Sequence, residues 1–540
     1  MERKVETSLE KKTWEMTEDI WLKRKELIRC FFILFLTGIV VYFPILCQGL
    51  NNTYDGLWQP TYMTAGGWEI SLGRWLWPYW DRLHFGIQSG HINTMFTIVA
   101  FALGLTLAKA CMSRSNSLIS VLAGCLFMAN TVVCISLSYP SMSGVFGMAF
   151  LLSVAAAYAI IKIENNGIAI GAGVICLTAS IGMYQAYICV FCLIALVAFF
   201  QKLEKDSLIE IGSYVFRVGI CAVAGVALYV LILKAHIILL DVSISDYKGA
   251  AGISLGNSLA NLKQSIARTY ELFSVYFWGS EYRHSIWQMN RLFFGVVFAA
   301  LGAALFVHWG NKLKERQYGR VLAQAAIVLA LPIACLMILL AATEANLSMQ
   351  MMGGLAMLLP VCAWTVDVLW QASTSKPRWI IASATVLTAL ALYGSVYMAA
   401  VDQEAMKEGI GATKMMANQI VQDLNRGEYM SQSQENTVML LGRPSANATF
   451  KKGNFFEKAN QYARVGRFWT KEDCMRRAWA GVFNKYVPIN IKMCSQEQYL
   501  SLFETDEVQK MPSYPNEGYI RQIGDVVVVK VSDEYANVEE

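Results

Sequence analysis

The sequence predicts a polytopic α-helical membrane protein that ends in an α/β domain outside the membrane. Of its 540 residues, 55% are apolar and only 16% are charged, whereas an ordinary globular domain is about 25% charged. Residues 1–400 contain about 49 Asp, Glu, Lys and Arg, and residues 401–540 contain about 36. This division excludes a single water-soluble globule, a disordered chain and a disulfide-stapled secreted domain. The net charge of +5 gives no reason to expect nucleic acid as a partner.

The apolar runs of residues 30–400 predict the membrane domain, which follows a charged cytoplasmic segment at 1–29. A membrane-spanning helix needs about 20 apolar residues. Runs of about this kind lie at 31–50, 93–111, 117–138, 143–161, 214–238, 291–309, 321–342, 350–370 and 379–400. The run at 168–200 is too long for one span, so we expect it to cross and return with a turn at 182–185. The total is then about eleven spans. A secretory signal peptide, the alternative for the first run, would have a shorter charged segment and a small-x-small cleavage pattern.

The distribution of basic residues predicts the orientation. Short cytoplasmic loops collect Lys and Arg, and residues 1–29 contain eight of them. The N-terminus is therefore expected inside, and an odd number of spans places residues 401–540 outside. Two outer loops, 51–92 and 241–290, are longer than a passive connection requires. The second contains an amphipathic pattern at 254–277, which predicts a helix.

The C-terminal domain, residues 401–540, combines short apolar runs with charged segments, as in a small α/β fold. Strands are predicted at 437–441, 489–491 and 526–529, and helices at 403–424 and 495–503. Cys474 and Cys494 are the two cysteines of this domain. In an oxidising compartment they form either a disulfide or two free thiols.

Several familiar catalytic motifs are absent from the sequence. It has no GxxxxGK[ST] phosphate loop, no HExxH and no CxxC outside the predicted bilayer, so neither nucleotide hydrolysis nor a structural zinc site is expected. Residues 1–400 also lack the charged chains within spans that mark an ion pathway. The sequence requires no cofactor, and it is compatible with the use of a divalent metal ion.

Polar residues gather instead in the first outer loop. Asp55 directly follows the first span, and Arg74, Asp81 and Arg82 follow among tryptophans. A carboxylate can take a proton from an attacking hydroxyl, and an arginine can hold a phosphate through two charge-assisted bonds. Together they suit a reaction at headgroup height in which a phosphate leaves and a hydroxyl attacks. On chemistry alone, a solvated interfacial loop remains an alternative.

Four short motifs occur in a fixed order between residues 30 and 532. They are Asp55 after the first span, Ile70-Ser71-Leu72-Gly73-Arg74-Trp75 with Pro78 and Asp81 after it, Gly182-Met183-Tyr184-Gln185-Ala186, and the ending from Tyr514-Pro515 to Val531-Ser532. Together they resemble the bacterial Gtr-type glucosyltransferases, the glucosyl transferase II family. The resemblance implies a GT-C-like, multi-pass enzyme of the bacterial cytoplasmic (inner) membrane. Such an enzyme takes glucose from undecaprenyl phosphate and transfers it to a cell-surface glycan, an O-antigen or a Gram-positive wall polymer.

The resemblance also suggests roles for individual residues. Asp55 matches the acidic residue of the first outer loop and is the expected general base, although Gly56 stands where a second carboxylate is common in the class. Arg74 and Lys234 are expected to bind the donor phosphate. The expected substrate-binding residues are Tyr54, Asp81, Arg82, Tyr184 and Gln185. Simpler roles remain for these side chains: interfacial anchoring for Arg74, snorkelling for Lys234, and satisfying the backbone at a helix break for Tyr184 and Gln185.

The expected function is therefore that of an inverting glycosyltransferase acting on the outer face. Its partners would be a polyprenyl-phosphate sugar donor, a surface-glycan acceptor and membrane lipids. The alternatives are a transporter or flippase of lipid-linked sugars and a surface-glycan polymerase. A transporter would need a polar path through the bilayer, and a polymerase would need more arginine in the loop at 241–290.

Overall fold

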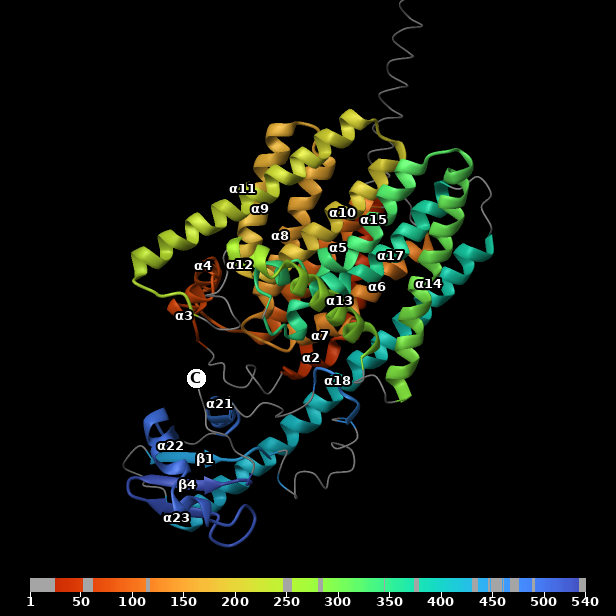
Figure 1. Cartoon of the computed structure of the whole chain (residues 1–540). Coiled ribbons are helices and arrows are strands. Elements are labelled where there is room, and N and C mark those ends of the chain that lie inside the picture. Colours follow the sequence, from red (N-terminus) through yellow and green to blue (C-terminus); the bar gives the residue numbers. More distant parts are fainter. Residues whose placement is uncertain are drawn as a thin grey trace, which may run out of the picture.

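The computed structural model of the protein describes residues 25–51, 62–112, 117–245, 255–279, 285–343, 345–372, 378–429, 436–444, 447, 459, 461–466, 475–487 and 491–533. It consists of a large bundle of helices and a smaller part that contains a sheet (Figure 1). The long helix α18 (Arg378–Arg426) runs from the bundle to the sheet. We call the bundle the membrane body.

The membrane body is built from helices of the length that a bilayer requires. Residues 25–41 are helical and continue past Tyr42 into α2 (Phe43–Gln48). The following helices are α5 (Gly90–Met112), α6 (Leu118–Met128), α7 (Thr131–Leu137), α8 (Ser143–Lys162), α9 (Asn166–Met183), η1 (Gln185–Tyr187), α10 (Ile188–Lys205), α11 (Leu208–Leu240), α14 (Ser285–Lys314), α15 (Tyr318–Cys335), α16 (Ile338–Ala341), η4 (Met349–Met351) and α17 (Gly353–Ala372). Among the described residues, nine helices are long and apolar enough to cross a membrane, and the bent pair α6–α7 would make a tenth. The predicted polytopic helical fold is confirmed, whereas the count of about eleven stays a prediction.

Two breaks interrupt the apolar runs at polar residues. The run at 168–200 divides at 184–187, because α9 ends at Met183 and α10 begins at Ile188, which confirms the predicted turn. The helices α6 and α7 meet at an angle of 43°. Here Asn130 caps α7 by accepting a hydrogen bond from the amide of Val132. At both breaks, backbone N–H and C=O groups lose their helical hydrogen-bond partners, and nearby polar side chains can replace those partners.

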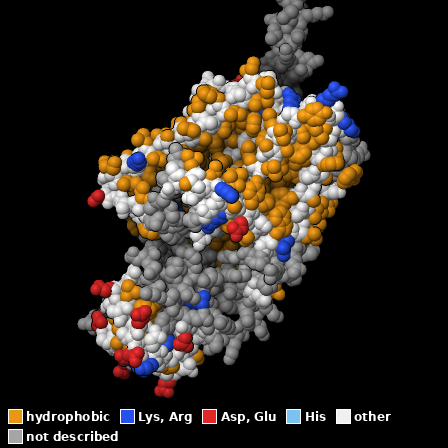
Figure 2. Space-filling model, in the orientation of Figure 1, with side chains coloured by type: hydrophobic (Ala, Val, Ile, Leu, Met, Phe, Trp, Pro, Cys, Tyr) orange, Lys and Arg blue, Asp and Glu red, His pale blue; other side chains and the backbone are white. Residues whose placement is uncertain are grey.

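The surface of the membrane body is largely apolar. Figure 2 shows hydrophobic side chains over much of the face of the bundle, while acidic side chains gather on the smaller part below it. Among the membrane-length helices, α11 is the least covered by the rest of the protein: only 11% of its most apolar 18-residue stretch is buried. An exposed apolar helix of this length is stable where lipid replaces water.

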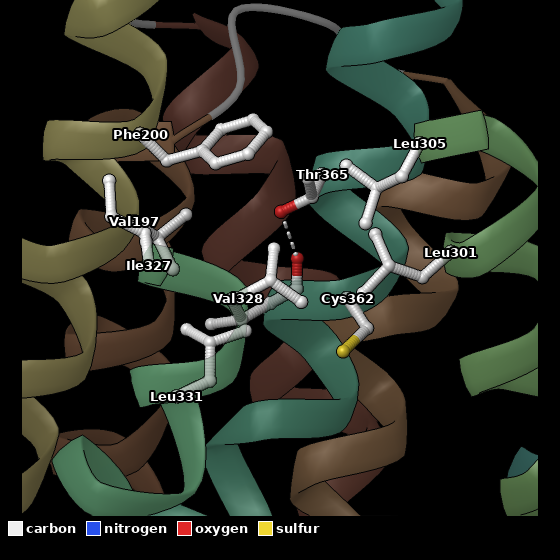
Figure 3. Close-up of a pocket in the computed structure, with 10 residues that line it drawn as sticks. Val197, Phe200, Leu301, Leu305, Ile327, Val328, Leu331, Cys362 and Thr365 are labelled. Atoms are coloured by element: carbon white, nitrogen blue, oxygen red, sulfur yellow. Dashed lines mark hydrogen bonds between the residues drawn. The ribbon is translucent and has the colours of Figure 1, made fainter. Parts of the chain in front are cut away.

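A small apolar hollow lies between α10, α14, α15 and α17 (Figure 3). It is lined by Val197, Phe200, Leu301, Leu305, Ile327, Val328, Leu331, Val361, Cys362 and Thr365. The Thr365 hydroxyl donates to the Val361 carbonyl of its own helix at 2.8 Å. The hollow therefore presents hydrocarbon walls and no convergent polar groups.

Four short helices belong to the two long predicted outer loops. They are α3 (Gly67–Ser71), α4 (Trp77–Leu83), α12 (Leu255–Ala260) and α13 (Leu262–Trp278). The last two confirm the helix predicted at 254–277. Arg268 on α13 donates to the carbonyls of Thr343 and Ala345, so α13 is fastened to the segment that follows α16.

The smaller part contains a four-stranded sheet of order β2-β1-β4-β3. The strands are β1 (Asn436–Leu441), β2 (Ile491–Met493), β3 (Ile520–Ile523) and β4 (Val526–Lys530), and the helices beside them are α21 (Met475–Tyr486), α22 (Gln496–Phe503) and α23 (Asp506–Gln509). Strand β1 runs parallel to β2 and β4, and β3 pairs antiparallel with β4. The strands predicted at 437–441 and 526–529 and the helix at 495–503 are confirmed. The predicted helix at 403–424 is also helical, but as part of α18, which continues without a break past residue 400.

The remaining domain predictions are not tested. Of the strand predicted at 489–491, only Ile491 lies among the described residues, where it begins β2; residues 489 and 490 lie outside them. Cys474 also lies outside them, so its pairing with Cys494 stays a prediction. The same holds for the position of residues 401–540 outside the membrane.

Candidate active site

The best-defined polar site lies where the segment between α3 and α4 meets the break between α9 and α10. Gln185 donates from Nε2 to the Leu72 carbonyl at 2.6 Å, and the Gly182 carbonyl accepts from the amide of Leu76 at 3.0 Å. Two regions more than 100 residues apart in sequence are thus joined by one side chain-to-backbone bond and one backbone-to-backbone bond. The predicted motifs at 70–75 and 182–186 are neighbours in space.

Glycines allow this close approach. Gly73 has a φ of 81°, a left-handed conformation that glycine adopts without strain. A Cβ at Gly73 would lie 2.4 Å from Tyr229 Oη, and a Cβ at Gly182 would lie 2.6 Å from the Trp75 ring. The glycines of both motifs therefore have a packing role.

Arg74 lies between aromatic rings at this junction. Its guanidinium carbon is 4.8 Å from the centre of the Tyr184 ring and 5.8 Å from that of Trp77. Its Nε is buried without a hydrogen-bond partner, and no carboxylate pairs with the guanidinium within the part of the chain that the structure describes. Stacking on aromatic faces orients a guanidinium and leaves its edge donors available for an anion.

Tyr229 on α11 completes the junction. Its hydroxyl donates to the Gly73 carbonyl at 3.0 Å and accepts from Gln185 Nε2 at 3.2 Å. Sequence reasoning missed Tyr229 because it lies within a continuous apolar run. Of the two predicted sugar-binding residues at the break, Gln185 is thus already bonded to backbone and to Tyr229, whereas Tyr184 is buried against Arg74.

Asp81 on α4 is almost fully buried and holds the preceding segment. Its Oδ2 accepts from the Ala65 amide at 2.7 Å, and its Oδ1 lies 3.4 Å from His84 Nε2. Burial raises the pKa of Asp81 to about 6, against the lowering effect of the Ala65 hydrogen bond and of His84. The neighbouring Arg82 is exposed and lies over the Tyr79 ring, with 5.4 Å from its guanidinium carbon to the ring centre.

Lys234 is exposed on α11, two residues before a histidine that connects α11 to α4. His236 Nδ1 faces the Ile232 carbonyl at 2.8 Å, and Nε2 faces Tyr79 Oη at 2.9 Å. Because a carbonyl only accepts, Nδ1 carries the proton of the first contact, and Nε2 is the atom that joins α11 to Tyr79 on α4. Sequence reasoning also missed His236. The one feature that could have indicated it is its position, near the end of an apolar run and two residues after Lys234.

The first outer loop itself is only partly described. Tyr54 and Asp55 lie outside the described residues, so their roles stay predictions. The residue before that segment, Asn51, is buried and donates from Nδ2 to Tyr486 Oη on α21 at 3.3 Å. The start of the loop is therefore in contact with the C-terminal part of the chain.

A second buried polar cluster joins α18 to residues 464–466. Asp402 Oδ1 accepts from the amides of Arg464, Val465 and Gly466 at 2.6, 2.8 and 2.9 Å. Arg464 extends to Thr131 Oγ1 at 3.3 Å and to the Tyr276 carbonyl at 3.1 Å. These groups connect α7, α13 and α18. Sequence reasoning treated Asp402 as part of a charged domain and missed this contact.

The apolar helices of membrane length define a polytopic membrane protein. Its candidate site is cationic, because Arg74 lies against Tyr184 at the break between α9 and α10. Residues 59–361, more than half of the chain, match the family model for the glucosyl transferase GtrII. The chain belongs to the GtrII glucosyl transferase family, and its role is that of a glycosyltransferase, as its motifs predicted. No curated protein and no solved structure matches it. The matched range includes Arg74, Asp81, Arg82, Tyr184, Gln185 and Lys234, and it ends before α18.

Proposed function

We propose that this glycosyltransferase moves a hexose, most often glucose in this class, from a polyprenyl phosphate to a cell-surface glycan on the outer face of the membrane. The observation that carries the proposal is Arg74, a cation without a carboxylate partner among the described residues, stacked on Tyr184 at a helix break. Such a group suits a phosphate that is presented at the membrane surface. No nucleotide is needed, because the donor phosphodiester already carries the driving force.

The proposed reaction is a single displacement at the anomeric carbon. The acceptor hydroxyl oxygen attacks C1 from the face opposite the phosphate, and the bond between C1 and the phosphate oxygen breaks. The hydroxyl proton passes to the carboxylate of Asp55, and polyprenyl phosphate leaves with the bonding electrons. The configuration at C1 is inverted. Arg74 stabilises the negative charge that grows on the leaving phosphate.

The other predicted residues have supporting roles in this proposal. Lys234 adds a second cation on α11, and Arg82 with Tyr54 faces the sugar or the acceptor. Tyr184 orients Arg74, and Gln185 fixes the turn that carries Arg74. Asp81 acts through position, because it fastens the segment before α3 to α4.

The test is a transfer assay with membranes that contain the full chain. They are incubated with radiolabelled undecaprenyl-phosphate glucose and purified surface polysaccharide. Label in the polysaccharide is expected, and Asp55→Asn should abolish it while insertion and expression stay normal. Movement of intact donor across the membrane would instead support a transporter. Full transfer by the Asp55→Asn protein would refute the proposed base.

A further inference from the structure

Two lysines of the C-terminal part converge on one aromatic ring beside the first outer loop. Lys414 Nζ on α18 is 4.2 Å from the centre of the Tyr486 ring, and Lys485 Nζ on α21 is 5.5 Å from it. The two ammonium groups are thus separated by no more than the sum of these distances, which is short enough for one segment of a polyanion to contact both. Neither has an acidic partner within the described part of the chain.

Two like charges held together are unfavourable without an anion between them. The pKa of Lys485 is lowered by burial and by the charge of Lys414. Two other lysines of the C-terminal part are paired: Lys407 on α18 lies 3.1 Å from Glu404, and Lys510 at the end of α23 lies 2.7 Å from Asp506. Lys414 and Lys485 differ from these paired lysines because no acidic side chain among the described residues neutralises them. Departures of this kind from ordinary pairing are typical of sites where a ligand supplies the missing negative charge.

Asn51 adds a second, independent observation. It is fully buried and donates to Tyr486 Oη, but its Oδ1 has no hydrogen-bond partner within the described residues. A buried acceptor without a donor costs free energy, and a sugar hydroxyl is a suitable donor. An aromatic ring, an amide oxygen and two cations together fit a saccharide that carries negative charge.

We propose that Asn51, Lys414, Lys485 and Tyr486 form a subsite for an anionic segment of the acceptor, a glycan that bears phosphate or carboxylate groups. The inference rests on the proposed function, which assigns the donor phosphate to Arg74 and leaves this second cationic site to the acceptor. Figure 1 shows α21 between the membrane body and the sheet, and the hydrogen bond from Asn51 to Tyr486 joins α21 to the chain just after α2.

The test compares binding of three labelled polymers to the purified full chain in nanodiscs of zwitterionic lipid. The polymers are poly(glycerol phosphate), polygalacturonate and neutral dextran. The wild type should bind at least one polyanion about ten-fold more tightly than dextran, because only the polyanions can form charge-assisted bonds with the two lysines. The Lys414→Gln, Lys485→Gln double variant should lose this preference, and the corresponding double Arg variant should keep it. The control is Lys407→Gln with Lys510→Gln, which removes two paired charges and should leave binding unchanged.

Three results would overturn the inference. They are equal binding of all three polymers by the wild type, a preference that persists in the double Gln variant, and a rise in the donor KM of that variant with unchanged polyanion binding. The last result would assign the lysines to a lipid phosphate. Because binding is measured without donor, it is independent of transfer. Lysine-dependent binding without any glucose transfer would refute the proposed function and leave the anion subsite intact.

Discussion

At the scale of single residues, Arg74 shows how an aromatic setting prepares a cation for a ligand. Tyr184 and Trp77 hold the guanidinium in place, so little side-chain entropy is lost when an anion binds. Lysine keeps the charge but has neither the planar fork nor the stacking face. The identity of the cation at this position should therefore matter as much as its charge.

The first prediction concerns Arg74→Lys. We expect the KM for the lipid-linked donor to rise about ten-fold, the equivalent of about 1.4 kcal/mol, with little change in the KM for the acceptor. Initial rates measured at varied donor and acceptor concentrations separate the two constants. Arg426→Lys, at an exposed position on α18, is the control. An unchanged donor KM in the Arg74→Lys enzyme would contradict the phosphate role.

The second prediction concerns the pH dependence of Asp81. Because its pKa is raised from 3.8 to about 6, the folded protein binds the proton more tightly than the unfolded chain does. The stabilisation is complete below about pH 4 and is lost as the pH rises through about 6. The thermal midpoint of Asp81→Asn in detergent should therefore fall less between pH 4.5 and 7 than that of the wild type. Asp506→Asn, at an exposed site, should follow the wild-type curve. Parallel curves for wild type and Asp81→Asn would show that this carboxyl is not the titrating group.

At the scale of elements, the contact between the 72–77 segment and the α9–α10 break depends on the absence of side chains. Both Gly73 and Gly182 contact atoms of the opposite segment more closely than a Cβ permits. The break is therefore part of the candidate site, although its backbone also serves as a turn between two spans.

The third prediction uses two glycines of the same helix. Gly182→Ala should displace Trp75 and the adjoining Arg74, with an overpacking cost of about 1–3 kcal/mol and a marked loss of transfer. Gly171→Ala on α9 places its methyl group in open space, so its activity should match the wild type. Transfer assays on equal amounts of inserted protein compare the two. Equal activity of both variants would mean that the junction tolerates movement of Arg74.

The sequence predicted elements better than contacts between them. The turn at 182–185 could be predicted because charged flanks on both sides of a 33-residue apolar run require a return. Strand β3 was missed, since Ile520-Arg521-Gln522-Ile523 is too short and polar to stand out and is fixed by pairing with β4. The continuity of α18 past residue 400 was missed because the rise in charge there implies a boundary, yet no helix-breaking residue accompanies it.

The sequence predicted which residue types form the candidate site, but it did not predict which of these residues contact each other. Arg74 and Tyr184 were both named, but their stacking joins positions far apart in the chain, which composition and spacing do not report. Tyr229 and His236 contribute polar atoms from within apolar runs, where a single polar group looks like an ordinary lipid-facing or core residue. Asp81 was predicted to bind substrate, and this stays a prediction; its burial and its hydrogen bond from the Ala65 amide are a structural contact that the sequence did not indicate.

At the scale of the whole molecule, Asp402 fastens residues 464–466 to the membrane body. Three backbone amides share one buried carboxylate oxygen, and removing that oxygen leaves them unsatisfied at about 1–3 kcal/mol each. The contact also positions Arg464 against Thr131 and Tyr276. Its loss should loosen the attachment without unfolding the separate parts.

The fourth prediction is that Asp402→Ala accelerates hydrogen exchange of the amides at 464–466. Exchange within β1 and β4 should stay unchanged, because the sheet is held by its own ladder. Mass spectrometry of the full chain in detergent reads both segments. Glu404→Ala, which removes a partly exposed partner of Lys407 on the same helix, is the control. Unaltered exchange at 464–466 would show that other contacts suffice to hold them.

The 49 residues of α18 extend over about 73 Å at the usual rise of an α-helix, more than twice the hydrocarbon thickness of a bilayer. A helix that crosses a membrane answers a change of bilayer thickness by changing its tilt. Because α18 leads without a break from the bundle to the sheet, a change of tilt at its buried end moves the far end laterally and in height. The lipid composition of the host membrane would thus change the position of the sheet relative to the membrane body.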